Sequence, residues 1–380
     1  MIAFINGIFH ELSGRVQKML EDLHGRQSTS EVPKPFFQKT LSLLSELSKD
    51  VIAILISQDL TYEEFASNHL IKYNTLHERF LAIELYRYQA IVHYNKSEKY
   101  FNALIARIYE EVNCLQSAPL VACISNSDNY YWVYPIYDII AVPFGEEKNL
   151  LNLPDIFHEI GHLLCGQYIV FFKGQGKIDK ALEEYFTVEI RNIELENRDK
   201  SRIPELKKTF EYWKDSWIEE FICDLVATYL TGPAYAWTNF KIASISNSDK
   251  GIFSFSSEHP SDERRMYAII KMLEKMGYKH EVETLKSSWQ NFLVICTNTR
   301  NPLYNLFLPV DIIDKLVDTV IDACNNIALV SCVEQSKNNG DPVSKLLNQA
   351  WIENLTQPKT FSDWEHAQIK GLNDALLVNG

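Results

Sequence analysis

The stretch FHEIGHLLCG, residues 157–166, holds two histidines four residues apart, with Glu159 directly after the first of them. Residues at this spacing lie on one face of an α-helix, with their Cβ atoms roughly 5–6 Å apart. The imidazoles of His158 and His162 can therefore converge on one ion without distortion of the backbone. Two interpretations are open: a helical metal-binding pair, or two histidines that are hydrogen-bonded within a buried helix.

The neighbouring residues set the expected limits of this helix. Pro154 and Asp155 suit its first turn, because the N–H that proline lacks is unpaired there and an acidic side chain is favourable near a helix N-terminus. Gly166 suits its end. Gly161, between the histidines, has two explanations: it allows another helix to pack closely, or it is a tolerated glycine that costs the helix about 1 kcal/mol.

A second pattern supplies a candidate for the third protein ligand that a catalytic zinc ion requires beside its water position. In WIEEFICDLVATYLTGP, residues 217–233, Glu220 and Asp224 are four apart at the edge of an apolar helical stripe. Glu219 points farther from that stripe, so Glu220 is the better candidate ligand. Asp224, one turn later, is placed to accept an N–H from a metal-binding histidine. The alternative is an exposed helix face.

A third pattern, EHPSDERRMYAI at residues 258–269, places His259 before a helix and Arg265 six residues later. An imidazole and a guanidinium facing a metal can bind the oxyanion that develops when water attacks a carbonyl, or can hold the carboxylates of ligand and substrate. Both are therefore candidate catalytic residues; the alternative is that they cap and pair on their own helix. Tyr229 and Tyr235 are further hydroxyl candidates, for which core packing is the favoured explanation.

The three patterns together resemble those of the gluzincin metallopeptidases, and the third is similar to the branch of CaaX prenyl proteases and heat-shock metalloproteases. That branch has HExxH, then ExxxD on a later helix, then HP with an arginine six residues after the histidine. The resemblance is confined to residues 136–270. The matching residues are His158, Glu159, His162, Glu220, Asp224, His259, Pro260 and Arg265.

The resemblance implies a zincin core with one Zn²⁺ per chain. Its expected zinc ligands are His158, His162 and Glu220. Glu159 is then the general base that takes a proton from the attacking water and returns it to the leaving amine. Asp224 supports a zinc-binding histidine, while His259 and Arg265 face the substrate or its carboxylates.

The resemblance also gives a role to YDIIAVPF, residues 137–144, within the one convincing strand region of the sequence. The segment is similar in placement to the edge strand of zincins, which pairs with an extended peptide substrate through its backbone. Ile140, Ala141 and Val142 are the expected substrate-binding residues. Two features depart from the branch: a charged two-helix insertion precedes Glu220, and no apolar run approaches the roughly 18 residues of a membrane-spanning helix.

Of all 380 residues, 46% are apolar. Outside the patterns described above, their spacing is mainly helical. The expected fold class is mainly α with a small β-sheet (α+β). The sequence predicts a helical N-terminal region at 1–118, a zincin-like metallopeptidase core at 119–277 and a helical C-terminal region at 278–380. The start of the chain is expected to form an amphipathic helix rather than a signal peptide, because it lacks a basic segment and polar residues interrupt it with helical spacing.

Charge and cysteine content exclude some partners and compartments. The formal net charge of -13 repels phosphate backbones, so no nucleic-acid partner is expected. Seven cysteines occur without a CxxC pair, which favours a reducing compartment and a cytoplasmic location. Cys165 and Cys223 lie near the two metal-binding patterns and are taken as small core residues.

The function predicted from these patterns is that of a soluble zinc metallopeptidase acting on a protein or peptide substrate. Its long helical flanks favour narrow, regulatory specificity. A second hypothesis is a non-catalytic, zinc-stabilised regulatory or interaction module. The presence of Glu159 favours catalysis instead, because a structural zinc site does not need that carboxylate. Hydrolysis of a non-peptide amide would use the same residues. The sequence does not indicate the oligomeric state.

Overall fold

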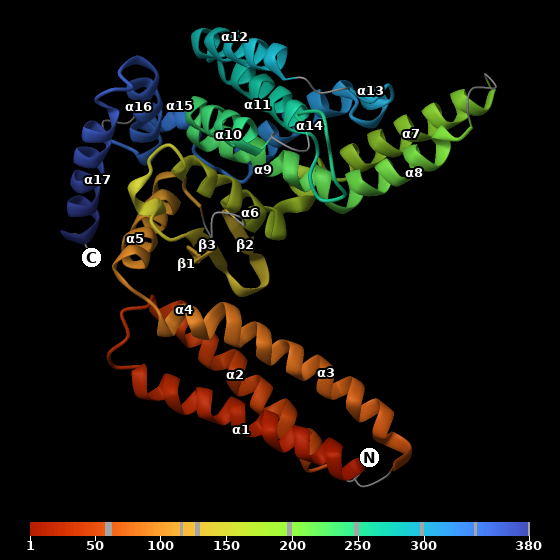
Figure 1. Cartoon of the computed structure of the whole chain (residues 1–380), viewed down its shortest axis with the longest axis vertical. Helices are drawn as coiled ribbons and strands as arrows, with labels where there is room; N and C mark the ends of the chain where they lie inside the picture. Colours follow the sequence, from red (N-terminus) through yellow and green to blue (C-terminus); the bar gives the residue numbers. More distant parts are fainter. Residues whose placement is uncertain are drawn as a thin grey trace. The chain divides into compact units, whose positions relative to one another are not determined.

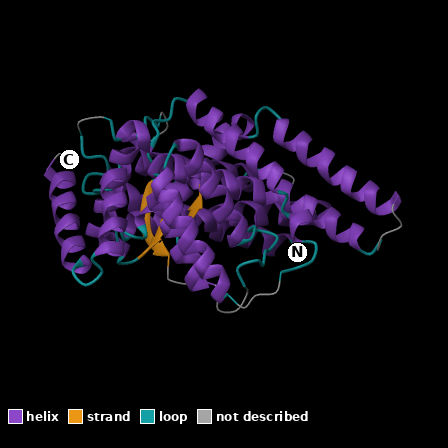
Figure 2. Cartoon of the chain, turned by 90° about the horizontal axis from the view of Figure 1, so that it is seen from above, coloured by secondary structure: helices purple, strands orange, loops and turns teal. Residues whose placement is uncertain are grey.

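The computed structural model of the protein describes residues 1–57, 63–114, 117–125, 130–195, 200–246, 251–296, 300–337 and 340–378. Helices dominate it, with one small sheet (Figure 1, Figure 2), so the prediction of a mainly α fold with a small β-sheet is confirmed. Contacts divide the chain into two compact units. Unit 1 comprises Met1–Ile105 and Ala118–Phe144, and unit 2 comprises Ala106–Ser117 and Gly145–Gly380.

The helices of unit 1 pack around an apolar core. Their bounds are α1 (Ile2–Arg26), α2 (Lys34–Leu55), the 3₁₀ turn η2 (Glu63–Phe65), α3 (Ala66–Ala82), the π-helical turn η3 (Ile83–Tyr88), α4 (Gln89–Val92) and α5 (Lys96–Glu111), which continues into unit 2. Phe9, Leu12 and Val16 are buried along one face of α1. The start of the chain thus forms the expected amphipathic helix.

The sheet of unit 1 has three strands among the described residues. They are β1 (Leu120–Ser125), β2 (Trp132–Tyr134) and β3 (Ile139–Pro143), with the 3₁₀ turn η4 (Pro135–Tyr137) between the last two. The strand order is β1-β3-β2. β3 pairs with β1 in parallel and with β2 in antiparallel orientation, so it is the central strand.

This order contradicts the prediction that residues 137–144 form an edge strand. Ile140 and Ala141 each have a ladder partner on both neighbouring strands. The side chains of Ile140, Ala141 and Val142 are fully buried. Because the neighbouring strands already occupy the backbone on both sides at Ile140 and Ala141, no edge is left there for a substrate strand. The predicted edge position is therefore wrong, and a substrate role of these residues stays a prediction.

The sheet shares its core with the N-terminal helices. Leu120, Ala122 and Ile139 belong to the same buried cluster as the apolar faces of α1 to α4. The contacts therefore place the strands in unit 1 and the HEIGH helix in unit 2. The division into three functional regions, at 1–118, 119–277 and 278–380, stays a prediction.

Unit 2 is built around α9, which packs against α6, α10, α11, α14 and α16. Its helices and turns are η5 (Glu146–Lys148), η6 (Leu153–Asp155), α6 (Ile156–Phe172), α7 (Lys177–Leu195), α8 (Arg202–Tyr212), the π-helical turn η7 (Trp213–Trp217), α9 (Ile218–Thr231), α10 (Pro233–Ser246), α11 (Asp262–Met276), α12 (Lys279–Ile295), α13 (Tyr304–Phe307), α14 (Val310–Asn326), α15 (Cys332–Gln335), α16 (Val343–Thr356) and α17 (Phe361–Val378). Since α9 is almost entirely buried, its residues are held on several sides.

The HEIGH helix is longer than the sequence indicated. Pro154 and Asp155 lie in a 3₁₀ turn directly before α6 rather than in its first turn, and α6 continues through Gly166 to Phe172. The helix is distorted at Tyr168, where φ is -117° and ψ is 15°. Phe172 is fully buried. Its burial, which stabilises by roughly 1.5–3 kcal/mol, offsets the cost of about 1 kcal/mol for a glycine within a helix.

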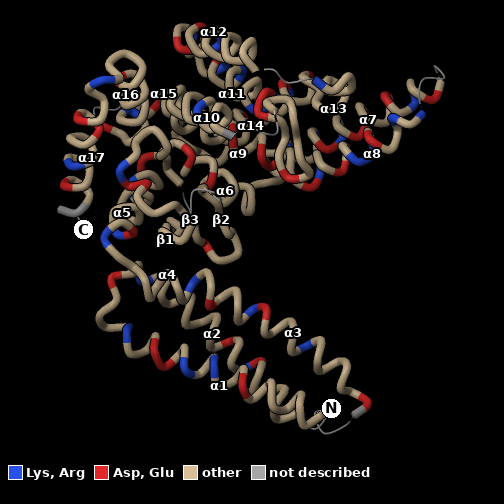
Figure 3. The backbone as a smooth tube through the Cα atoms, in the orientation of Figure 1, with Lys and Arg blue, Asp and Glu red and all other residues tan. Residues whose placement is uncertain are grey.

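The charged segment before Glu220 forms the two expected helices. α7 and α8 pack against each other as a hairpin (Figure 1). Basic and acidic residues are interspersed along both helices (Figure 3), which is typical of a solvated surface. Across the described part of the chain, no helix combines the length and the apolar character needed to cross a bilayer.

Candidate metal centre

The candidate site begins with the contact between α6 and α9. A Cβ atom added at Gly161 would lie 2.8 Å from the Cα atom of Cys223, closer than real side chains approach. Only glycine therefore fits at this position without moving the helices. Of the two explanations for Gly161, close helix packing is the one that the structure supports, and the packing brings the two metal-binding patterns together.

The two imidazoles face one carboxylate. Nε2 of His158 lies 3.5 Å from Oε2 of Glu220, and Nε2 of His162 lies 3.5 Å from Oε1 of the same residue. Side-chain atoms that bind one ion at about 2.0–2.2 Å lie about this far from one another. Residues 58 positions apart in sequence thus present three ligand groups to one point.

Carboxylates also hold the other nitrogen of each imidazole. Nδ1 of His158 lies 3.0 Å from Oδ1 of Asp224, as the sequence predicts for this aspartate. Nδ1 of His162 lies 2.9 Å from Oε1 of Glu219. A carboxylate that accepts the Nδ1–H fixes the tautomer of the imidazole. The electron pair on Nε2 is then free to bind a cation. Both rings are oriented for a cation on the Glu220 side.

Asp224 is the centre of a buried network. Arg265 donates to it through two hydrogen bonds, from Nε to Oδ2 at 2.8 Å and from Nη2 to Oδ1 at 2.7 Å. The hydroxyl of Tyr235 donates to Oδ1 at 2.6 Å and lies 3.1 Å from Nδ1 of His158. Tyr235 therefore belongs to the site, whereas Tyr229 bonds to Asn325 and packs in the core.

Arg265 lies beside the carboxylates of Asp224 and Glu220. Its Nη2 atom is 4.0 Å from Oε2 of Glu220, and its side chain is largely buried. This geometry suits the second of its expected roles, which is to hold carboxylates in place. A catalytic role for Arg265 stays a prediction.

His259 has the opposite environment. Its side chain is 57% exposed, and its Nε2 atom lies 3.9 Å from Oε2 of Glu220. The loop that carries it is fixed by two hydrogen bonds, from Trp217 Nε1 to the Ser256 carbonyl and from Ser216 Oγ to the Ser257 carbonyl. The imidazole thus reaches the carboxylate from the solvent side.

The charges of the cluster favour a cation at the imidazoles. Burial alone would raise the pKa of Glu220, but the close contact and charge of His158, with the charges of Arg265 and His162, lower it to about 2. Burial likewise opposes the ionisation of Asp224, yet Arg265 holds its pKa well below the usual range. Burial lowers the pKa of His158, but Asp224 and Glu220 together raise it well above its ordinary value. Ionised carboxylates thus surround a place for positive charge.

Two further acids lie at the start of α6. Glu159 is buried, and burial raises the pKa of its carboxyl above the ordinary value despite the nearby charges of His158 and His162. Burial also raises the pKa of Asp155 to about 7. A carboxyl with a raised pKa is suited to accepting and returning a proton near neutral pH. Sequence reasoning assigned this task to Glu159 and gave Asp155 only a place in the first helical turn.

Two side chains of α9 compete as the third ligand. His158, His162 and Cys223 each place a ligand atom within 4.8 Å of the others, so this group could hold a metal ion. Cys223, however, packs against the backbone of Gly161, and burial together with Cys165 raises the pKa of its thiol well above the ordinary value. Metals bind the thiolate form. Glu220 is ionised and lies 3.5 Å from both Nε2 atoms, and its role as the third ligand stays a prediction.

One buried carboxylate oxygen indicates that a metal ion would fit between these side chains. Oε2 of Glu220 is inaccessible to solvent and has no hydrogen-bond partner in the described structure, although it lies between three nitrogen-bearing side chains. An unpaired buried carboxylate oxygen is costly. A cation at the two Nε2 atoms would give this oxygen the partner it lacks, and two imidazoles with a carboxylate are a ligand set that Zn²⁺ prefers.

The structure therefore brings together all the site residues predicted outside the strand. These are His158, Glu159, His162, Glu220, Asp224, His259 and Arg265. Their roles stay predictions. The sequence indicated neither the contact of Glu219 with His162 nor that of Tyr235 with Asp224: Glu219 was the weaker candidate ligand, and core packing was favoured for Tyr235. No family model, no curated protein and no solved structure matches this chain.

Proposed function

We propose that the protein is a zinc-dependent metallopeptidase that hydrolyses peptide bonds in a protein or peptide substrate. The observation that carries this proposal is the position of the Glu220 carboxylate, 3.5 Å from the Nε2 atoms of both His158 and His162. Carboxylates behind both imidazoles and the buried Glu159 beside them support it. The resemblance of the three sequence patterns to gluzincins points to the same reaction class.

Each residue then has a physical task. Zinc, when bound, supplies Lewis acidity and lowers the pKa of water to about 7. The Glu159 carboxylate accepts the proton of the attacking water and delivers it to the leaving amine. His259, on the solvent side, donates a hydrogen bond to the oxygen on which negative charge develops. Asp224 and Glu219 orient the imidazoles, and Arg265 holds Asp224.

A second candidate is a non-catalytic module in which zinc is structural. The observation that favours it is the nearness of Cys223 to both imidazoles. Two histidines, Glu220 and the Cys223 thiolate would together make a closed site of four protein ligands, which leaves no position for water. The two candidates therefore differ in whether Cys223 binds the metal.

Cleavage of a diverse peptide mixture tests the proposal. The zinc-loaded wild type is expected to create new peptide termini, which mass spectrometry identifies. Glu159→Gln is expected to keep its zinc and to lose activity by a factor of about 10²–10⁴, because it removes proton transfer but no ligand. Glu183→Gln, on the exposed face of α7, is the matched control and should cleave like the wild type. Equal cleavage by the Glu159→Gln variant would contradict the assigned mechanism.

The Cys223→Ser variant separates the two candidates. Serine nearly preserves the volume beside Gly161 but removes the thiolate. A three-ligand catalytic site keeps its zinc and its activity in this variant. Loss of zinc together with loss of folded structure, in a protein whose wild type cleaves no peptide, would favour the structural module.

A further inference from the structure

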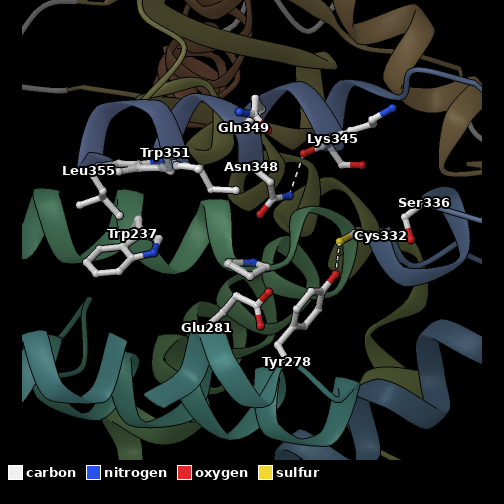
Figure 4. A pocket seen from close by; sticks show the side chains of 13 residues that line it. Trp237, Tyr278, Glu281, Cys332, Ser336, Lys345, Asn348, Gln349, Trp351 and Leu355 are labelled. Carbon is white, nitrogen blue, oxygen red and sulfur yellow. Dashed lines mark hydrogen bonds between the residues drawn. The ribbon is translucent and has the colours of Figure 1, made fainter. Parts of the chain in front are cut away.

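A second feature of unit 2 is a cavity of about 310 Å³ that shares no residue with the candidate metal centre (Figure 4). Its walls come from α10, α12, α15 and α16 and from the turn at Tyr278. This volume lies at the lower end of the range for small-molecule sites, roughly 300–1,000 Å³. The cavity is thus large enough for a small ligand or for one long side chain of a peptide.

Aromatic rings line the cavity and are held in place by their neighbours. The Trp237 indole stacks with that of Trp351, with ring centroids 6.2 Å apart and planes at 27°. Trp351 is fixed in turn, because its Nε1 atom donates to Oγ1 of Thr238 at 3.1 Å. On the other side, the Tyr278 hydroxyl lies 2.7 Å from Sγ of Cys332. These contacts fix the positions of the rings before any ligand binds.

The polar groups of the cavity differ in their availability. The Asn348 amide already donates to the Thr231 and Ser344 carbonyls, and Lys345 pairs with Asp341 at 2.7 Å. Glu281 has no ion pair or hydrogen bond within the described ranges, and Figure 4 shows its carboxylate turned toward the cavity. Its charge also acts on the Tyr278 hydroxyl, whose pKa is raised by burial first and by Glu281 among the smaller causes. An available negative charge therefore accompanies the aromatic rings.

This combination selects one class of ligand. The face of an aromatic ring attracts a cation, with tryptophan the strongest, and a carboxylate adds direct charge attraction. The apolar rings favour a cation that carries methyl or methylene groups over a hydrated metal ion. The formal net charge of -13 attracts cations from a distance. From these features, we propose that the cavity binds an organic ammonium ion with an apolar body.

Such a cation has two sources, a free amine or the methylated lysine of a peptide. Isothermal titration calorimetry with choline and with Nα-acetyl-Nε-trimethyl-lysine methylamide distinguishes them, because both carry the same head group. The proposal predicts saturable binding of at least one probe, and the tighter probe identifies the source. The uncharged isostere of choline, 3,3-dimethylbutan-1-ol, should bind at least tenfold more weakly.

Variants locate the binding in the cavity. Glu281→Gln should weaken binding about fivefold or more, and Trp237→Leu should abolish it, while circular dichroism confirms that both variants fold. Glu283→Gln, an exposed neighbour on α12 outside the cavity, is the matched control and should bind like the wild type. Absence of binding by both cations, equal binding of the uncharged isostere, or wild-type affinity in Glu281→Gln would each overturn the proposal. None of these outcomes depends on the metal centre, so the proposed peptidase function is tested separately.

Discussion

At the scale of single residues, Arg265 determines whether Asp224 can orient His158. Its guanidinium donates two hydrogen bonds to the Asp224 carboxylate, from Nε and from Nη2. Removing one partner of a buried ion pair costs about 3–5 kcal/mol, because the other charge is left unpaired. We expect Arg265→Met to lose this much stability by urea denaturation. Its zinc affinity should fall about 10–100-fold in competition titrations.

The neighbouring Arg264 provides the control. It is also buried, but its Nε atom donates to the Leu308 carbonyl and its Nη2 atom to Asn305, away from the ligands. Arg264→Met should therefore lose stability and keep the zinc affinity of the wild type. If both variants lowered zinc affinity equally, the effect would come from general unfolding, and the positioning role of Arg265 would be refuted.

Glu219 is expected to tune the second zinc ligand. Since it accepts the Nδ1–H of His162, the variant Glu219→Gln keeps the size of the side chain and loses the charge. Partners of this kind are worth about 10–100-fold in metal affinity. The measurement is competition with a chelating dye. Glu211→Gln on α8, whose partner is Lys214, should leave the affinity unchanged; an unchanged affinity in Glu219→Gln as well would remove Glu219 from the site.

Asp155 gives a pH dependence with a definite sign. Burial raises its pKa to about 7 in the folded protein, against about 3.9 in an unfolded chain. The protonated carboxyl therefore stabilises the fold fully below about pH 3.9, and this contribution is lost as the pH rises to about 7. In the metal-free protein, Asp155→Asn should gain up to about 4 kcal/mol of unfolding free energy relative to wild type between pH 4 and 7. A difference independent of pH would show that Asp155 is not held protonated.

Residue spacing predicted part of the site for a clear physical reason. His158 with His162, and Glu220 with Asp224, are pairs one helical turn apart, so each pair shares a face wherever its helix packs. Glu219 was set aside as a ligand because it lies off the apolar stripe. Its side chain is 43% exposed, yet it reaches His162 on the neighbouring helix. Tyr235 comes from α10, and no spacing within one helix could have placed it on Asp224.

At the scale of elements, the contact between α6 and α9 depends on Gly161. We expect Gly161→Ala to be far more harmful than alanine within a helix usually is, since the new Cβ atom would lie 2.8 Å from the Cα atom of Cys223. Overpacking of this kind costs about 1–3 kcal/mol and separates the two helices. Both the melting temperature and the zinc affinity should fall.

Gly166 in the same helix is the matched control. A Cβ atom there meets nothing within 4 Å, and alanine is the better helix former. Gly166→Ala should therefore stabilise the protein slightly and leave its zinc affinity unchanged. If Gly161→Ala behaved in the same way, the close approach of α6 and α9 would not be needed for the site.

Two predictions about elements were wrong: the end of the HEIGH helix at Gly166 and the edge position of the strand at residues 137–144. A glycine predicts the end of a helix only if the residues beyond it gain nothing by continuing, and Phe172 gains a fully buried position. The strand error has a similar cause. The uninterrupted apolar run Ile139–Val142 is typical of a strand buried on both faces, which indicates a central position, but the resemblance to zincins favoured an edge.

At the scale of the whole molecule, the predicted fold class was correct because helical periodicity extends over most of the chain. The boundaries of the compact units were not predicted, because they depend on contacts between residues that are far apart in the sequence. Leu120 and Ile139 of the sheet share a core with α1 to α4, although the sequence places them next to the HEIGH helix.

The proposed function requires that His158, His162 and Glu220 bind one zinc ion. The most direct test is the metal content, by plasma mass spectrometry, of wild type, Glu159→Gln and His162→Ala, each purified without chelator or affinity metal. We predict about one zinc ion per chain in the wild type and in Glu159→Gln, and its loss in His162→Ala. A folded wild-type protein without zinc or another transition metal, or a His162→Ala variant that keeps its zinc, would contradict the account.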